Sequence, residues 1–113
     1  MVGSIQHDLI VTIVNKGDAE KVVNASREAG AEGGTILLGR GTGIHEQTRL
    51  FGMLIEPQKD VILTLVKRQI SNQVLEAIIQ RADLNKPGRG ITFVIPVDRV
   101  AGITHLEQIK NKE

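Results

Sequence analysis

The sequence contains no cysteine, tryptophan or tyrosine, and aromatic residues make up only 2 % of its 113 positions. Without cysteine, neither disulfide bonds nor thiolate chemistry is available to the chain. Without aromatic side chains to stack on bases, binding of single-stranded nucleic acid is disfavoured. The core must therefore be built from isoleucine, valine, leucine and alanine, in a chain whose length suits one domain.

Charge of one sign and long apolar runs are also scarce. The formal net charge is +1, which provides no field that would attract nucleic acid. No apolar stretch reaches the length of a membrane span, and the N-terminus shows no basic patch followed by a long apolar run. We therefore expect a soluble cytoplasmic protein that neither binds nucleic acid nor inserts into membranes.

Hydrophobic patterning predicts alternating strands and helices. Strands are expected over residues 9–14, 35–38, 48–55, 61–66 and 91–97, and residues 99–103 could continue the last one. Asp18 is expected to cap the first helix, and Gly30 stands where a glycine ends one. Ser71 or Asn72 is expected to cap the second helix, whose apolar face is formed by Val74, Leu75, Ile78, Ile79 and Ala82.

Turns and breaks separate these elements. Residues 39–47 are predicted to be flexible and polar. Residues 56–60 are predicted to form a turn that contains Pro57, so that segments 48–55 and 61–66 pair as a hairpin or near-hairpin. Pro96 has no backbone N–H group, which places its strand at the edge or end of a sheet.

The order of elements is β-α-β-β-α-β, the ferredoxin-like arrangement of an α+β fold, in which two helices back one face of an antiparallel sheet. We expect one domain over residues 1–113, with its core over residues 8–104 and a polar tail at 105–113. Segment 61–66 is apolar on both faces, and no helix remains to cover the second face. We infer that this face packs against other copies of the chain in a cyclic oligomer.

Two glycine-containing segments are candidates for anion binding. The first glycine segment, residues 33–43, reads GGTILLGRGTG, and the second, residues 86–90, reads KPGRG. The first matches no phosphate-binding fingerprint and precedes a strand, so taken alone it indicates a strand that ends in a loop. In the second, backbone amides next to glycine can form an anion-binding nest that Arg89 could join. A simple turn with a solvated arginine is the alternative.

The sequence shows no catalytic constellation. No aspartate pair is spaced for acid–base work, and no serine or threonine has a recognisable base, so we expect a protein that is not an enzyme. The histidines are His7, His45 and His105, and none has a second ligand at metal-binding spacing. A trimer could still gather one histidine from each chain.

Taken together, the two segments carry a resemblance. GAEGGTILLGRGTG followed, after a hairpin and a helix, by NKPGRGITFVIPVDRVAGI resembles the PII family of nitrogen-regulatory signal proteins over nearly the whole chain. Their order and separation make the pattern much more specific than either segment alone. The resemblance implies a compact homotrimer with three lateral clefts between subunits, each of which binds ATP or ADP.

The resemblance also implies roles for individual residues in that cleft. Thr35 would face the base, with Ile13 and Leu65 as apolar walls. Gly88, Arg89 and Gly90 would form the B-loop that wraps the phosphates. The nucleotide-binding residues implied in this way are Ile13, Thr35, Gly41, Gly43, Leu65, Gly88, Arg89 and Gly90.

The first glycine segment would lead into the T-loop, which starts at Gly41 and Gly43. In the family this loop contacts the regulated partner, which is a transporter, an enzyme or a transcription regulator. Arg40, His45 and Glu46 would be its polar contacts here. His45 stands where the family has a glutamine that binds metal–2-oxoglutarate.

Several departures from the family pattern bear on the ligand. The T-loop is shorter than usual and has neither the tyrosine that is uridylylated nor any serine between positions 39 and 48. Ile91 replaces a lysine, and Gly102 and Thr104 replace two arginines, whereas Arg89 replaces an acidic residue. Because charge-assisted contacts dominate phosphate recognition, we expect weak ATP binding or a preference for ADP or AMP, with no required cofactor.

The competing hypothesis is a metal-binding trimer that resembles the copper-tolerance proteins of similar fold. It would use His7, His45 or His105 as ligands.

Overall fold

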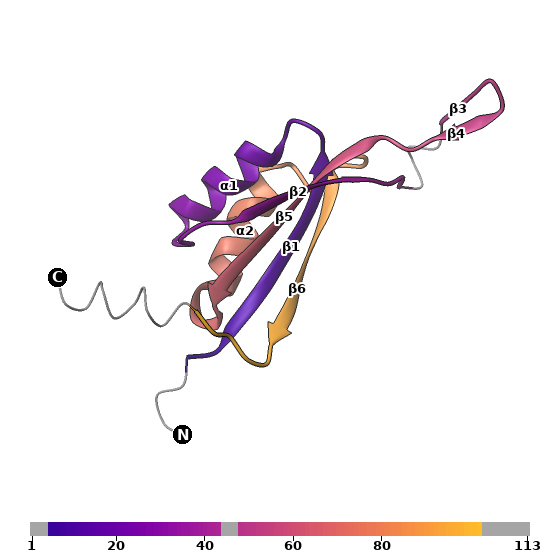
Figure 1. Cartoon of the computed structure of the whole chain (residues 1–113). Helices are drawn as coiled ribbons and strands as arrows, with labels where there is room; N and C mark the ends of the chain where they lie inside the picture. The colour runs from indigo at the N-terminus through magenta and orange to yellow at the C-terminus, as the bar shows by residue number, and fades with distance from the viewer. Residues whose placement is uncertain (1–4, 44–47, 103–113) are drawn as a thin grey trace.

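The computed structural model describes residues 5–43 and 48–102 and shows an antiparallel sheet with two helices on one face (Figure 1). The four strands of this sheet, in spatial order, are β2 (Thr35–Arg40), β5 (Gln58–Lys67), β1 (His7–Asn15) and β6 (Gly90–Val97). The helices are α1 (Ala19–Glu28) and α2 (Ser71–Arg81), and a 3₁₀ turn, η1 (Arg68–Ile70), leads into α2. This arrangement confirms the predicted ferredoxin-like α+β fold.

The core lies between the helices and one face of the sheet. Alternate residues of β1 and β5 point into it, and it is filled by Ile10, Val14, Ile62 and Val66 from the strands and by Val22, Val74 and Ile78 from the helices. Of the predicted apolar face of α2, Val74, Ile78 and Ala82 belong to the core and Leu75 packs against it, whereas Ile79 does not. At the β1–β6 boundary the hydroxyls of Thr12 and Thr92 lie 3.0 Å apart. Thr92 also lies 3.2 Å from the Val11 carbonyl oxygen.

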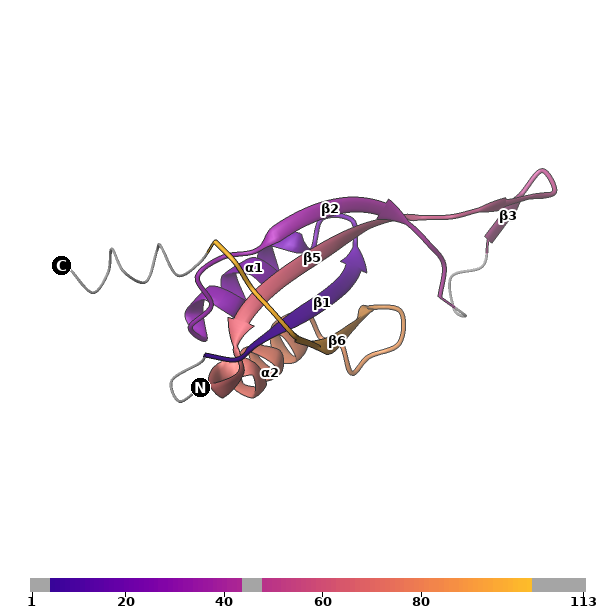
Figure 2. The ribbon, with the colours of Figure 1, turned by 60° about the horizontal axis from the view of Figure 1, so that its bottom comes forward.

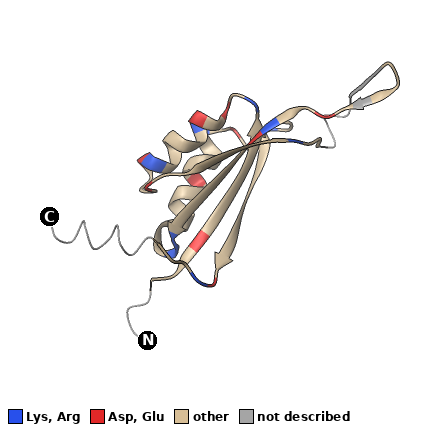
Figure 3. Ribbon diagram, in the orientation of Figure 1, with Lys and Arg blue, Asp and Glu red and all other residues tan. Residues whose placement is uncertain are grey.

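The other face of the sheet is apolar and has no cover in a single chain. Ile91, Phe93 and Ile95 of β6 are between 41 % and 56 % exposed, and on this face they flank Val11 and Ile13 of β1. Charged residues lie at the strand ends and on the helices, whereas the middle of the sheet carries none (Figure 3). We call this surface the open face. Its apolar character confirms that the central strands are apolar on both sides.

One predicted strand pairing is wrong. Segment 48–55 does not pair with β5 but folds on itself as β3 (Thr48–Leu50) and β4 (Met53–Ile55), a hairpin that projects beyond the sheet (Figures 1 and 2). Its two-residue turn is made by Phe51 and Gly52, both with positive φ, which matches the twist of a tight hairpin. The predicted turn at 56–60 is also shorter than expected, because β5 begins at Gln58. Residues 58–63 of β5 pair with the whole of β2.

Several element ends also differ from expectation. Gly39 and Arg40, predicted to belong to a flexible stretch over residues 39–47, belong to β2, and residues 44–47 lie outside the described residues. The Asp18 side chain does not cap α1; instead the Asp60 carboxylate accepts hydrogen bonds from the backbone N–H groups of Gly17 and Ala19.

The remaining ends are mixed in outcome. Gly30 ends α1 with a φ of 116°, as predicted. Ser71 and Asn72 lie inside α2 rather than capping it, because η1 already supplies its first turn. Pro96 lies on edge strand β6, as predicted, but residues 99–102 form no strand. None of the helices within residues 5–43 and 48–102 is long and apolar enough to cross a membrane.

Candidate functional site

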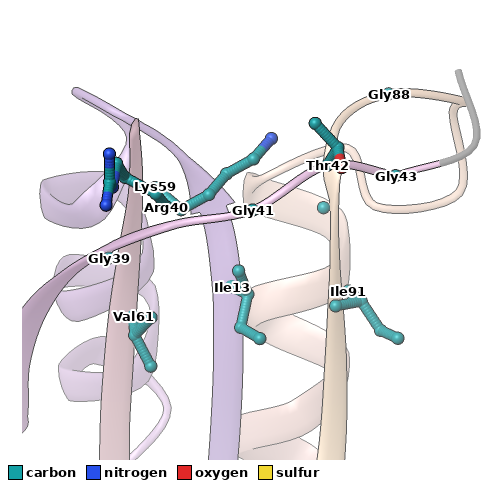
Figure 4. Close-up of a pocket in the computed structure, with 11 residues that line it drawn as sticks. Ile13, Gly39, Arg40, Gly41, Thr42, Gly43, Lys59, Val61, Gly88 and Ile91 are labelled. Carbon is teal, nitrogen blue, oxygen red and sulfur yellow. The ribbon is translucent and has the colours of Figure 1, made fainter. Parts of the chain in front are cut away.

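A cavity of about 450 Å³ lies between the two glycine segments at one end of the open face. Thr42 and Gly43 approach the loop that carries Gly88, and apolar side chains form the opposite wall (Figure 4). The residues that line it are Ile13, Gly39, Arg40, Gly41, Thr42, Gly43, Lys59, Val61, Gly88, Gly90 and Ile91. Segments far apart in the sequence therefore meet at one site.

The second glycine segment is held tightly against β1. Gly90 has a φ of 143°, and a Cβ atom there would overlap the carbonyl oxygen of Ile13 and lie 3.1 Å from Val14 Cγ1. Gly88 also has a positive φ, of 78°. Both positions favour glycine because L side chains rarely adopt such backbone conformations, and Gly90 needs it also because its backbone contacts that of β1.

Lys59 is the buried cation of this cavity, and the sequence interpretation missed it. The residue is 8 % exposed, and its ammonium group donates a hydrogen bond to Asn15 Oδ1 at 2.9 Å. The Asn15 Nδ2 group donates in turn to the Gly88 carbonyl at 3.0 Å. In the sequence, a lysine next to Asp60 at the start of a strand is expected to be exposed to solvent. Its place beside the cavity follows only from the pairing of Lys59 with Asn15 between β5 and β1.

Arg40 adds a second cationic residue at the edge of the cavity. It also lines a neighbouring hollow of about 350 Å³ together with Lys16, Gln58 and Asp60. The cavity thus combines an apolar wall of Ile13, Val61 and Ile91 with a cationic rim. Such a site can hold a ligand that has an apolar or aromatic part and an anionic part.

Comparisons with known proteins identify the family of the chain. The sequence profile of the family described as nitrogen regulatory protein P-II matches residues 7–107. The chain belongs to the P-II family. The crystal structure of Arabidopsis thaliana PII bound to citrate resembles this P-II protein with a TM-score of 0.68 and 23 % sequence identity, over 92 % of this chain and 89 % of that chain. No curated protein sequence matches it.

The structure of this P-II protein brings most of the predicted nucleotide-binding residues to the cavity. Ile13, Gly41, Gly43, Gly88 and Gly90 all line it. The two glycine segments therefore line one cavity.

Three predicted residues lie elsewhere. Thr35 pairs with Leu63 in β5, and Leu65 lines a different hollow, beside His7. Leu65 pairs with Leu9, four residues from Ile13, which is about 13 Å along the strand. Arg89 is exposed and does not line the cavity.

The predicted polar contacts of the T-loop are only partly visible. Arg40 lines the cavity, whereas His45 and Glu46 lie outside the described residues, as do Thr104 and His105. Within the described part of the chain, no three side chains of histidine, cysteine, aspartate or glutamate form a group that could hold a metal ion.

Proposed function

We propose that this P-II protein is a regulatory protein, not an enzyme, that binds an adenine nucleotide in the cavity between its two glycine segments. The observation that carries the proposal is the meeting of these segments around Lys59, beside an apolar wall. An adenine ring suits apolar walls, and phosphates suit ammonium groups and the backbone amides of glycine-containing loops. We also propose that the protein is located in the cytoplasm.

The charges around the cavity favour a nucleotide with few phosphates. Lys59 and Arg40 are its cationic residues among the described part of the chain, and Ile91 adds an apolar surface. Each charge-assisted contact contributes roughly 1.5–3 kcal/mol, and a triphosphate needs several of them. The proposal is therefore weak ATP binding, with ADP or AMP preferred.

The proposal includes a homotrimer in which the open face is buried between copies. The exposed apolar residues of β6 and β2, which include Leu37, Ile91 and Phe93, favour such packing. Thr35 and Leu65 lie away from the cavity of their own chain. In the proposed trimer they contribute to the cavity of a neighbouring copy.

Regulation would act on a partner protein through the projecting segment that includes β3 and β4. Phe51 at the tip is 93 % exposed and has a φ of 52°, and Met53 beside it is 70 % exposed. A bulky residue in the left-handed region is strained, and strain of this kind concentrates at functional positions. We therefore propose Phe51 and Met53 as apolar partner contacts in addition to Arg40, His45 and Glu46.

Isothermal titration with ATP, ADP and AMP tests the ligand. We expect measurable ADP or AMP binding and weaker ATP binding. Tight, magnesium-dependent ATP binding that 2-oxoglutarate strengthens would contradict the preference, and no binding of any of the three would contradict the nucleotide proposal. Sedimentation equilibrium tests the assembly, and a monomer at micromolar concentration would contradict the trimer.

A further inference from the structure

The Asn15 side chain connects the two sides of the cavity. Its Oδ1 atom accepts from the Lys59 ammonium at 2.9 Å, and its Nδ2 group donates to the Gly88 carbonyl at 3.0 Å. The three residues lie far apart in the sequence and belong to β5, to β1 and to the second glycine segment. One amide thus contacts both the buried cation and the loop that closes the cavity.

The fold fixes Asn15 in this position. It is the last residue of β1 and pairs with Lys59 of β5 on one side. On the other side, the pairing with β6 stops one residue earlier, at Val14 and Gly90. The Asn15 side chain therefore reaches the carbonyl of Gly88 where the strand pairing ends.

The chain that follows Asn15 is also tied down. The Asn15 carbonyl accepts from the N–H of Asp18 at 3.1 Å. The Asp60 carboxylate accepts from Gly17 N at 3.0 Å. Because the backbone on both sides of Asn15 is held, its amide acts on groups that can move: the end of a lysine side chain and an exposed loop.

We propose that Asn15 is a positioning residue that couples the Lys59 ammonium to the second glycine segment. Only a side chain with both a donor and an acceptor can hold an ammonium and a carbonyl at once. An anion that draws the Lys59 ammonium toward the cavity pulls on its hydrogen bond to Asn15. The hydrogen bond from Asn15 Nδ2 to the Gly88 carbonyl then changes as well. Because such coupling is reciprocal, a shift of the loop changes the affinity of Lys59 for the anion. This inference rests on the proposed function only in taking the cavity as an anion site.

The coupling is testable without any ligand. Backbone amide NMR shifts of Arg89 and Gly90 are compared in the native chain, Lys59→Met, Asn15→Ala and the double variant. We expect Lys59→Met to shift these signals in the native background and to leave them unchanged in the Asn15→Ala background. Equal shifts in both backgrounds would overturn the coupling, because Lys59 would then reach the loop by another route.

An isosteric variant separates the two contacts and guards against a folding defect. Asn15→Asp keeps an acceptor for Lys59 but has no donor for the Gly88 carbonyl. We expect Asn15→Asp to move the loop signals as Asn15→Ala does. Loop signals that stay at their native positions in Asn15→Asp would overturn the role of the Gly88 contact. Asn24→Ala, on the exposed side of α1, is the matched control and leaves them unchanged.

Titration with ADP connects the coupling to binding. We expect Asn15→Ala to weaken ADP binding roughly 10-fold, since one hydrogen bond to a charged group is lost. Asn15→Asp weakens it further, because its carboxylate repels the phosphate. If the native chain binds ADP and both variants bind it equally well, the positioning role is overturned. If the native chain binds no nucleotide, the proposed function fails and the NMR comparison still decides the coupling.

Discussion

The two glycine segments meet at one cavity, but Gly90 of the second and Gly41 of the first have opposite surroundings. The second is pressed against β1, so that a Cβ atom at Gly90 would overlap the Ile13 carbonyl oxygen. In the first, a Cβ atom at Gly41 would meet nothing within 4 Å. The Gly41 N–H group donates to the Pro57 carbonyl at 3.1 Å, at the base of the projecting hairpin.

This difference separates two uses of glycine. At Gly90 the missing side chain lets one backbone lie on another, so the position is a packing requirement. At Gly41 there is room for a side chain, and the residue lies on the path from the sheet to the hairpin. We infer that the second segment is anchored to β1 at Gly90, whereas its exposed part around Gly88 and the first segment at Gly41 have room to adapt.

The substitution Gly90→Ala is the strongest test of the anchoring at Gly90. The variant combines an unfavourable φ with backbone overlap, and we expect a loss of about 3 kcal/mol or more in the free energy of unfolding. Urea denaturation measures it. A loss below about 1 kcal/mol would show that the second segment can move away from β1.

The substitution Lys59→Met tests the charge between the two segments. It keeps the aliphatic part of the side chain and removes the ammonium, so we expect ADP affinity to fall roughly 10- to 100-fold. Isothermal titration measures the affinity, with Lys21→Met, on the exposed side of α1 and away from the cavity, as the control. Equal ADP affinity of the native and Lys59→Met chains would show that Lys59 does not contribute to nucleotide binding.

The paired variants Arg40→Ala and Arg89→Ala compare the arginines of the two segments. Arg40 lines the cavity and Arg89 does not. We expect Arg40→Ala to weaken ADP binding about 5-fold and Arg89→Ala to change it less than about 2-fold. The reverse order would mean that the second segment turns toward the ligand when it binds, as the family resemblance implies for Arg89.

The smallest effect is expected for Gly41→Ala. The added methyl group meets open space, so we expect the free energy of unfolding to change by less than about 0.5 kcal/mol. It shares the denaturation assay of Gly90→Ala and is its matched control. A large loss would show that the first segment is as constrained as the second.

Local patterns in the sequence were sufficient for much of the fold. β1 and β6 consist mainly of β-branched and other apolar residues, and α2 shows a clear helical spacing, so their types could be predicted. The pairing of β5 with β2 rather than with segment 48–55 could not be predicted, because strand pairing depends on contacts between residues distant in the sequence. The Phe51–Gly52 turn also lacks the asparagine or aspartate that usually precedes glycine in such hairpins.

The glycines of the site could be predicted from the sequence, whereas its buried charge could not. Gly88 and Gly90 stand next to a proline in a short loop, which signals a special backbone. Lys59 has no such signal, because a lysine is ordinarily exposed, and its burial depends on the strand register that brings it beside Asn15. Thr35 and Leu65 entered through the family resemblance, and only the neighbours of each chain in an assembly can test them.

The hydroxyl pair of Thr12 and Thr92 determines where the second glycine segment tolerates a change in length. A residue inserted before Gly88 lengthens an exposed turn and leaves β6 in place. A residue inserted after Gly90 slips β6 by one position, which separates Thr92 from Thr12 and turns Phe93 from the open face toward the helices. In relatives of this chain, loop-length variation should therefore gather on the α2 side of Gly88.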